Sequence, residues 1–286
     1  MSEAKVTIVI PTFNRAILLA NAINSALSQS EKCNIIVVDH GSTDNTEEVV
    51  KRFGSEIEYV RLENDLGPIF SWVHGIVSAK TEFVKLLFDD DVLAPTFVSE
   101  ALSLMSSEVG FVASNASILN LDSGELVTDS LFGSFTETGV FRCSGVRAAR
   151  ISRQMISPSA LLLRKKDMLD GLYLGSLPFS EFEHHGAGPD HYVKLLVMLR
   201  YRYFAIIEHP LVSFGTHQGS ITAQASIDKI QETNLFSVYD EVWIFYNQLK
   251  FVRLFRFMLK PSRMAVRALE SAVVKLSKMT LNFTNK

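Results

Sequence analysis

The chain has 286 residues, of which 47% are hydrophobic and 21% charged, with a formal net charge of −3. These proportions are typical of a globular protein with a sizeable core and exclude a disordered chain. There is no apolar run of about 18 residues and no long apolar stretch at the N-terminus, so we expect a cytoplasmic protein. Cys33 and Cys143 are too few for a disulfide framework or a four-cysteine zinc site, and we interpret both as packing residues.

The charge is unevenly distributed along the chain. From Trp243 to the C-terminus, nine Lys or Arg residues stand against one acid, Glu270, which is a balance of +8. The total of −3 then leaves −11 for residues 1–242. We therefore expect the two parts to face different partners, and we expect no nucleic acid among them.

Strand and helix patterns alternate through the first third of the chain. The β-branched run 6–10 predicts a buried strand that ends at Pro11, and apolar residues at helical spacing predict a helix over 15–29. The same patterns predict, in order, a strand over 34–39, a helix beginning after 42, a strand over 57–61, a helix over 68–79 and a strand over 83–88. Strands that alternate with helices indicate the α/β class and a parallel sheet.

After residue 91 the alternation is less regular. The patterns predict a helix over 96–105, strand-like stretches over 109–113, 116–121 and 157–163, a polar loop over 179–190 and a helix over 190–200. No internal repeat or low-complexity linker marks a clean domain boundary, so we expect this part to extend the same sheet.

The residue pattern of the C-terminal region predicts a pair of amphipathic, basic helices. Residues 239–260 are rich in aromatic side chains and precede Pro261. On a helical wheel, one side holds Phe251, Leu254, Phe255 and Met258, and the other holds Arg253, Arg256, Lys260, Arg263 and Arg267. Such a helix either covers the core with a solvated face or lies on an anionic membrane surface, and the sequence supports both interpretations.

Acidic residues stand where a parallel sheet binds ligands, at the carboxyl end of a strand. The first turn reads Pro11-Thr-Phe-Asn-Arg15, which lacks the glycines of a dinucleotide-binding turn, and no Walker loop is present. Asp89, Asp90 and Asp91 follow the strand over 83–88, and a bound cation would relieve their mutual repulsion. Carboxylate oxygens favour Mg²⁺ or Mn²⁺, which can bridge to a diphosphate. An acidic loop or helix cap is the alternative.

Four motifs in order resemble glycosyltransferase family 2. They are Ile8-Val-Ile-Pro-Thr-Phe-Asn-Arg15, Val37-Val-Asp-His-Gly-Ser-Thr-Asp-Asn-Thr46, Asn64-x-x-Gly67 and Asp89-Asp-Asp91. The resemblance implies the GT-A fold, a mostly parallel central sheet flanked by helices. It suggests a catalytic domain over 1–222, with a nucleotide-binding half over 1–105 and an acceptor-binding half over 106–222, followed by a helical extension over 223–286.

The resemblance also implies roles for individual residues. The nucleotide would contact Pro11, Thr12, Asn14, Arg15, Asp39, Gly67 and Asp89. Mn²⁺ or Mg²⁺ would bind Asp90, with Asp91 as an alternative ligand and His217 from an H-x-x-S-like motif over 216–222. Phe88 stands where many members have their first acid, so the assignment among the three acids is open by one position.

Inversion at an anomeric carbon needs a base for the acceptor hydroxyl. Gly188–Leu195 resembles the family's Glu-Asp motif with Pro189 in place of Glu, which implies that Asp190 is this base. A helix N-cap is the alternative role of Asp190, and Glu181 and Glu183 are alternative bases. His184, His185 and His191 lack the spacing of zinc ligands and are expected to shape the acceptor pocket.

Together these inferences predict a metal-dependent inverting glycosyltransferase of the hexosyltransferase type. The donor would be a UDP-, dTDP- or GDP-sugar and the acceptor a glycan or lipid-linked hydroxyl, in the assembly of cell-surface polysaccharide or glycolipid. If the basic helices bind anionic lipid, the protein would be peripheral on the cytoplasmic face of a membrane. One alternative is a nucleotidyltransferase, whose usual Gly-rich, basic first turn is missing, and another is a non-catalytic sugar-nucleotide or glycan-binding module.

Overall fold

The computed structural model describes residues 3–174, 177, 187–217, 220 and 229–258, and in the last of these ranges it describes the side chains of 236–253. The chain divides into two compact units, Met1–Tyr246 and Asn247–Lys286. The boundary falls inside the last helix, whereas the motifs suggested one at residue 222. Among the described residues, no helix is both long and apolar enough to cross a membrane.

The N-terminal half of the sheet is parallel, as the alternation of strands and helices predicts. The order β3-β2-β1-β4 places the first strand in the middle, and each neighbouring pair is parallel. Because the strands are parallel, their carboxyl ends meet at one edge, and the loops after β1 and β4 lie side by side there. The bounds are β1 Val6–Thr12, β2 Cys33–Asp39, β3 Glu58–Arg61 and β4 Phe83–Leu86.

The second half extends the same sheet, as expected, but its pairing is mixed. It continues from β4 in the order β9-β6-β10-β5, in which β6 and β10 are parallel and the other neighbours antiparallel. The stretches predicted over 109–113 and 116–121 form one continuous strand, β6. The bounds are β5 Val92–Leu93, β6 Val109–Asn120, β7 Leu126–Thr128, β8 Gly139–Arg142, β9 Leu161–Arg164 and β10 Tyr203–Thr216.

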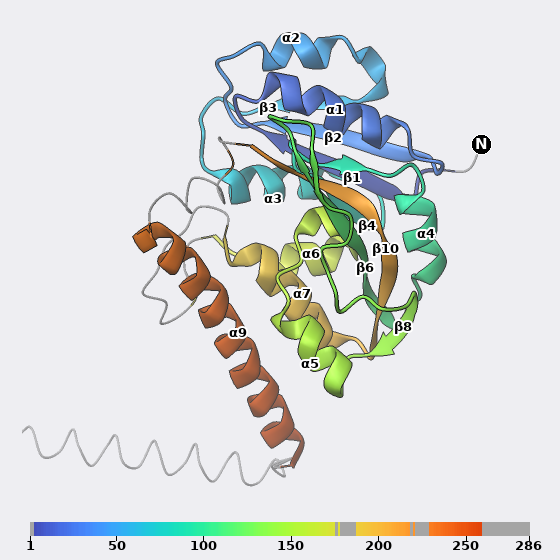
Figure 1. Ribbon diagram of the computed structural model, residues 1–286, viewed down its shortest axis with the longest axis vertical. Helices are drawn as coiled ribbons and strands as arrows, with labels where there is room; N and C mark the ends of the chain where they lie inside the picture. The colour runs from blue at the N-terminus through green and yellow to red at the C-terminus, as the bar shows by residue number, and fades with distance from the viewer. Residues whose placement is uncertain (1–2, 175–176, 178–186, 218–219, 221–228, 259–286) are drawn as a thin grey trace, which may run out of the picture. The chain divides into compact units, whose positions relative to one another are not determined.

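Helices cover both faces of the sheet (Figure 1). One face carries α1, α2 and α4, and the other carries α3, α6 and α7, with α5 packed against α7. Gly75 lets α3 approach the sheet closely, because a Cβ there would lie 2.3 Å from Val9 Cγ1. The bounds are α1 Ala16–Leu27, α2 Thr46–Lys51, α3 Pro68–Ser78, α4 Phe97–Leu104, α5 Val146–Arg153, α6 Lys165–Gly171, α7 Pro189–Arg200 and α9 Lys229–Met258.

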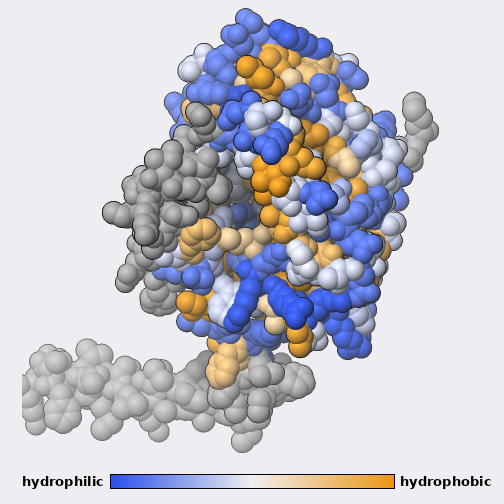
Figure 2. All heavy atoms as spheres, viewed as in Figure 1, coloured by the Kyte–Doolittle hydropathy of each residue, from blue (hydrophilic) through white to orange (hydrophobic). Residues whose placement is uncertain are grey.

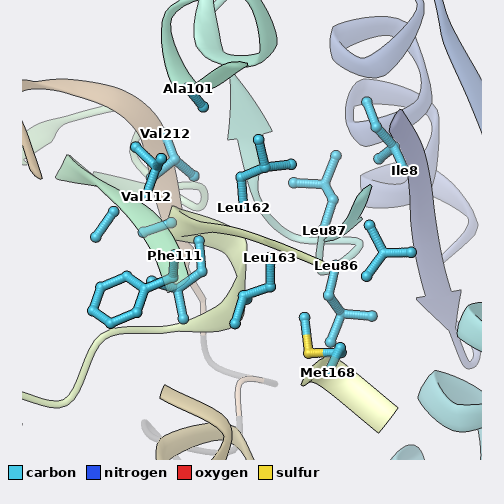
Figure 3. Close-up of a cluster of buried hydrophobic side chains, with 14 of the residues drawn as sticks. Ile8, Leu86, Leu87, Ala101, Phe111, Val112, Leu162, Leu163, Met168 and Val212 are labelled. Carbon is cyan, nitrogen blue, oxygen red and sulfur yellow. The ribbon is translucent and has the colours of Figure 1, made fainter. Parts of the chain in front are cut away.

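One large apolar core joins the two halves of the sheet. Figure 3 shows Leu86 and Leu87 from the end of β4 packed beside Leu162 and Leu163 of β9, at the junction of the parallel and mixed halves. Cys33 and Cys143 are half-buried against this core, in agreement with a packing role. Burial of branched aliphatic residues contributes about 1.5–3 kcal/mol per side chain, so this core fixes the loops at the sheet edge.

Candidate active site

A cavity of about 1000 Å³ opens at the carboxyl edge of the sheet. Its polar part comes from the loops after β1 and β4, and its apolar part from β6, the loops that follow β7 and α5, and α9. Figure 2 shows a hollow on the drawn face, with apolar surface gathered beside it over the β6–β7 region. The volume is at the upper end of the range for small-molecule sites, so a ligand with several rings fits.

Arg15 joins the first turn to the acidic loop at the cavity floor. Its Nη1 lies 2.9 Å from Asp89 Oδ1 and 3.0 Å from Asp90 Oδ2. Thr12 Oγ1 donates to the other oxygen of Asp89 at 2.8 Å. Three residues that the family resemblance assigned to the nucleotide therefore form one hydrogen-bonded group, and all of them line the cavity.

The charges of this group depend on one another. Burial alone would lower the pKa of Arg15, but the carboxylates of Asp89 and Asp90 outweigh it, so the net shift is upward. Burial raises the pKa of Asp89, and the positive charge of Arg15 opposes this effect. The guanidinium thus offsets part of the effect of burial on Asp89 and places a positive charge beside both carboxylates.

Two predicted metal ligands lie close together at the edge of the cavity, where Asp90 is part of the lining. His217 Nε2 lies 3.3 Å from Asp90 Oδ2, and both side chains are 13% exposed. Within the described ranges no group of three or more His, Cys, Asp or Glu residues is arranged to hold a metal ion. A carboxylate and an imidazole nevertheless fit a divalent cation that takes its remaining ligands from a diphosphate and water, as Mg²⁺ usually does.

Asp91 is turned toward the protein interior. Its Oδ1 accepts from the backbone N–H of Gly215 at 3.2 Å, and it interacts with Lys85, which lies fully buried beneath the loop. Burial, and then the neighbouring Asp90, raise the pKa of Asp91. Asp91 thus ties the acidic loop to β10, which His217 directly follows, while Asp90 is the acid that contacts this histidine.

Asp39 and Asn14 lie outside the cavity lining and hold loops together. Asp39 is fully buried, and its Oδ1 accepts from the backbone N–H of Ser42 at 2.8 Å while its Oδ2 accepts from the Tyr59 hydroxyl at 2.7 Å. Asn14, at φ 53°, accepts from the backbone N–H of Thr43 at 2.7 Å. Both side chains thus brace the loops that follow β1 and β2.

The loop before α3 supplies another wall of the cavity. Gly67 has φ 89°, a conformation that glycine adopts without strain, and its N–H donates to Asp65 Oδ1 at 2.8 Å. Asp65 Oδ1 also lies 2.8 Å from His40 Nδ1, and the His40 ring stacks on Phe13 with centroids 4.8 Å apart. This pair of rings presents a flat surface at the nucleotide end, which is suited to a base.

Asp190, in the first turn of α7, lines the same cavity as Asp90 although the two residues are far apart in the sequence. Its Oδ1 accepts from the N–H of His191 at 2.8 Å, and its Oδ2 accepts from the Tyr239 hydroxyl at 2.9 Å. Burial raises the pKa of Asp190 to about 6 despite these hydrogen bonds. At neutral pH the group is mainly ionised and can accept a proton, which is the state a general base needs.

His191 and Lys194 surround Asp190 from within α7. Burial lowers the pKa of His191 well below its usual value, so its ring is neutral, and its Nδ1 has no hydrogen-bond partner within the described part of the chain. Burial also lowers the pKa of Lys194 to about 7, and its ammonium donates to the Ile151 carbonyl at 2.7 Å and to the Gln154 carbonyl. Lys194 thereby holds the loop that brings Met155 to the cavity.

Several lining residues were not predicted from the sequence. Tyr239 and Phe236 come from α9, which the family resemblance had suggested as part of a separate extension over 223–286. Trp72 is packed in the core with 5% exposure, and it also reaches the cavity beside Phe88. Four large apolar side chains line the cavity while remaining exposed: Leu66, Leu131, Met155 and Phe236. A mixture of polar floor and exposed apolar lining is the feature that no motif indicated.

The alternative bases Glu181 and Glu183, and the histidines His184 and His185, lie outside the described residues. The same holds for the basic positions from Lys260 onward.

Comparison with known proteins identifies the family of the chain. The family model described as Glycosyl transferase family 2 matches residues 7–168, which is more than half of the chain. Among curated relatives, the GalNAc(5)-diNAcBac-PP-undecaprenol beta-1,3-glucosyltransferase of Campylobacter jejuni is 39% identical over 106 residues, which are 35% of this chain and 33% of that protein. An uncharacterized glycosyltransferase of Rickettsia typhi is 35% identical over 102 residues, 35% of this chain and 32% of that one. The match thus spans about a third of the length of each of these two relatives.

Solved structures resemble the chain over most of its length. TarS 1-349 of S. aureus, in complex with UDP-GlcNAc, superposes with a TM-score of 0.63 at 16% identity, over 91% of this chain and 77% of that one. The mannosyltransferase PcManGT of Pyrobaculum calidifontis, with GDP-Man and Mn²⁺, gives a TM-score of 0.51 at 16% identity, over 96% and 80% of the two chains. The fold is the GT-A fold that the motifs implied, and the chain belongs to glycosyltransferase family 2.

Proposed function

We propose that the protein is an inverting glycosyltransferase that moves a sugar from a nucleoside diphosphate onto a hydroxyl of a lipid-linked glycan. The observation that carries this proposal is that one cavity contains both the Arg15–Asp89–Asp90 group and the half-buried Asp190. The first binds charge at the donor end, and the second accepts a proton at the acceptor end. A single displacement needs both in one space.

The proposed reaction is a single displacement in which Asp190 accepts the proton of the acceptor hydroxyl. The acceptor oxygen attacks the anomeric carbon as Asp190 takes its proton, and the bond from that carbon to the diphosphate oxygen breaks. The electron pair leaves on the nucleoside diphosphate, and the configuration at carbon inverts because attack and departure occur on opposite faces. A direct displacement needs no covalent intermediate with the enzyme, so it uses no nucleophilic Ser or Cys.

The proposal includes a divalent cation that Asp90 and His217 would hold, because these two donors lie 3.3 Å apart. When bound, such a cation supplies positive charge to the departing diphosphate. Asp91 is not proposed as a first ligand, because its carboxylate is held by Gly215. Mn²⁺ and Mg²⁺ both suit the donor set, and the structural neighbour PcManGT was solved with Mn²⁺.

The exposed apolar lining supports a lipid-linked acceptor. Leu66, Leu131, Met155 and Phe236 are each more than a third exposed and line the cavity. Such a lining suits an acceptor whose sugar enters the cavity while its hydrocarbon stays outside. The name of the Campylobacter jejuni relative specifies an undecaprenol-linked acceptor, which agrees with this interpretation.

The experiment begins with donor binding. UDP-GlcNAc and GDP-mannose are each added to the full chain with and without Mn²⁺, and the melting temperature is recorded, because a ligand that binds only the folded state raises it. We expect one donor to raise the melting temperature more with Mn²⁺ than without it. Asp90→Asn should reduce this metal-dependent increment, whereas Asp129→Asn, an exposed residue outside the cavity lining, should not.

Turnover is then measured as release of nucleoside diphosphate with an undecaprenyl-diphosphate-linked N-acetylhexosamine acceptor. Asp190→Asn should keep donor binding and lose about 10²–10⁴-fold in turnover, the usual contribution of a positioned base. Donor binding without turnover in the unmodified chain would favour a binding module. Release of inorganic pyrophosphate from a nucleoside triphosphate and a sugar phosphate would favour a nucleotidyltransferase.

A further inference from the structure

The first half of α9 is anchored to the main unit by a buried stripe. Val238, Val242 and Tyr246 are four residues apart and are 5%, 0% and 2% exposed. Residues at this spacing lie on one face of a helix, so this face is the one packed against the body of the protein. The part of α9 up to Tyr246 is accordingly one compact unit with the sheet.

The same face of α9 packs directly against the turn that begins α7. Gly188, at φ 96°, has no room for a side chain, since a Cβ there would lie 2.9 Å from Val238 Cγ1 and 2.7 Å from the Tyr173 hydroxyl. Ala187 and Val238 form a small buried cluster with Tyr239 packed against it. The helix and the turn that carries Asp190 are therefore in van der Waals contact.

Tyr239 reaches from this contact to the carboxylate of Asp190. Its hydroxyl donates to Asp190 Oδ2 at 2.9 Å, and the backbone N–H of His191 donates to Oδ1 at 2.8 Å. The Tyr239 ring also packs edge-on against the His191 ring, with centroids 5.9 Å apart. With one donor on each oxygen, the plane of the carboxylate is fixed, and lone pairs remain for a proton from the cavity.

The phenol stays protonated while it makes this bond. Burial, and then the charge of Asp190, raise the pKa of Tyr239 far above its ordinary value, so Tyr239 is a donor throughout the working pH range. A donor of this kind stabilises the ionised carboxylate and opposes the effect of burial on the pKa of Asp190. In the part of the chain that the structure describes, the other titratable groups near Asp190 include His191 and Lys194 of α7 and Tyr173 after α6.

We propose that Tyr239 is a positioning residue for the base, and that the first half of α9 is part of the active site of this enzyme. The inference rests on the proposed role of Asp190. It extends beyond the residues that the family model covers, which end at 168. Tyr239 orients the carboxylate toward the acceptor and keeps it ionised at neutral pH.

The test is a direct titration of Asp190 that needs no substrate. Aspartate labelled with ¹³C at the carboxyl carbon is introduced into the full chain, and the Asp190 signal is identified by its loss in Asp190→Asn. Tyr239→Phe should raise the midpoint of this signal by about half a unit to one unit, because one hydrogen bond to the ionised form is lost. Tyr246→Phe is the matched control, since it removes a hydroxyl from the same helix outside the cavity lining and should leave the midpoint unchanged.

A second substitution changes the bond in the opposite sense without a change in fold. 3-Fluorotyrosine at position 239 is a stronger donor of nearly the same volume, and it should lower the midpoint of Asp190. With UDP-GlcNAc as the probe, nucleotide release by Tyr239→Phe should fall about two- to fivefold at pH 6 and approach the unmodified rate at pH 8, with an unchanged KM for the donor.

The possible results distinguish the role of Tyr239 from the role of Asp190. An Asp190 midpoint that is the same in the unmodified chain, Tyr239→Phe and the fluorinated protein overturns the role of Tyr239. An equal loss of turnover in Tyr239→Phe and Tyr246→Phe, with no change in midpoint, shows a purely structural helix. If Asp190→Asn retains full turnover, the proposed base is wrong even where the titration confirms the hydrogen bond.

Discussion

A single carboxylate, Asp190, sets the expected pH dependence of both activity and stability. Its pKa is raised to about 6 by burial. Since the base must be ionised, kcat/KM should fall about tenfold per pH unit below pH 6 and level off above it. The measurement is the initial rate of nucleotide release between pH 5 and pH 8.5, with the rate of the Asp190→Asn protein as the baseline.

Stability should change in the opposite direction at the same residue. Because the pKa of Asp190 is raised in the folded state from 3.8 to about 6, the cost of its ionisation accumulates as the pH rises from about 4 to 6 and is complete above that. At pH 8 this cost is at most about 3 kcal/mol, from the 1.4 kcal/mol that one pKa unit represents. The melting temperature of Asp190→Asn relative to the unmodified protein should thus increase between pH 4.5 and pH 7 and then level off, a few degrees above the unmodified protein at pH 8. A lower melting temperature at pH 8 would contradict this account.

The sequence predicts part of this site at the level of residues. Thr12, Arg15, Asp89 and Asp90 lie close together because their motifs follow neighbouring parallel strands, a relation that alternating strands and helices imply. Asp39 likewise stands at the end of a parallel strand. Its two carboxylate oxygens, however, accept hydrogen bonds from the backbone N–H of Ser42 and from the Tyr59 hydroxyl. The hydrogen bond from Tyr59 joins β3 to β2, and no local sequence pattern indicates that Asp39 is the partner of this tyrosine. Tyr239 was missed for the same reason, since its partner lies 49 residues away.

Among the elements, the contact between β10 and the acidic loop depends on one glycine. A Cβ at Gly215 would lie 2.1 Å from the backbone oxygen of Asp90 and 2.5 Å from Leu121 Cδ1. Gly215→Ala must therefore displace the loop that carries Asp90. We expect a loss of at least tenfold in kcat/KM, because a displacement of about 1 Å at reacting groups has effects of this size or larger.

Two further glycines separate this effect from a general loss of stability. Gly133→Ala should be neutral, since a Cβ there meets no atom within 4 Å. Gly110→Ala places a Cβ 2.4 Å from Val197 Cγ1 in the core, so it should lower the melting temperature without lowering the rate per folded molecule. If Gly215→Ala affects only the melting temperature, as we expect for Gly110→Ala, the loop does not depend on this contact.

The elements of the parallel half were predictable because short, largely apolar or β-branched strands alternate there with helical patterns. The mixed half was less so, and β10 shows why. Its middle reads Glu208-His209-Pro210, and the pairing with β6 shifts register on both sides of Pro210. A polar triplet with a proline ends an apolar pattern, yet the strand continues through the irregularity. Likewise, β9 pairs between β4 and β6 although it comes from a later part of the chain. Tertiary packing determines this position in the sheet, and no periodic pattern in the sequence indicates it.

The distribution of charge over the whole molecule coincides with the division into units. All nine basic residues counted in the C-terminal region lie in Asn247–Lys286, so that unit carries +8 and Met1–Tyr246 carries −11. A basic segment is attracted to anionic lipid by about 1 kcal/mol for each Lys or Arg near the surface, whereas the acidic unit is repelled. The lipid-linked acceptor proposed above would also reside in a membrane, so a basic unit that binds lipid would bring the enzyme to its proposed substrate.

Vesicle sedimentation tests this arrangement, and the natural end point for a shortened chain is Tyr246. Removal of 247–286 keeps the buried stripe of α9 and every residue that lines the cavity. We expect the full chain to sediment with phosphatidylserine-containing vesicles at low salt and to be released as the salt concentration rises. It should not sediment with vesicles of phosphatidylcholine alone. The chain that ends at Tyr246 should remain in solution with both vesicles and melt near the temperature of the full chain. Equal sedimentation of the two chains would show that the basic unit does not contribute to membrane binding. Any lipid contact would then be attributed to the apolar lining around Leu66 and Phe236.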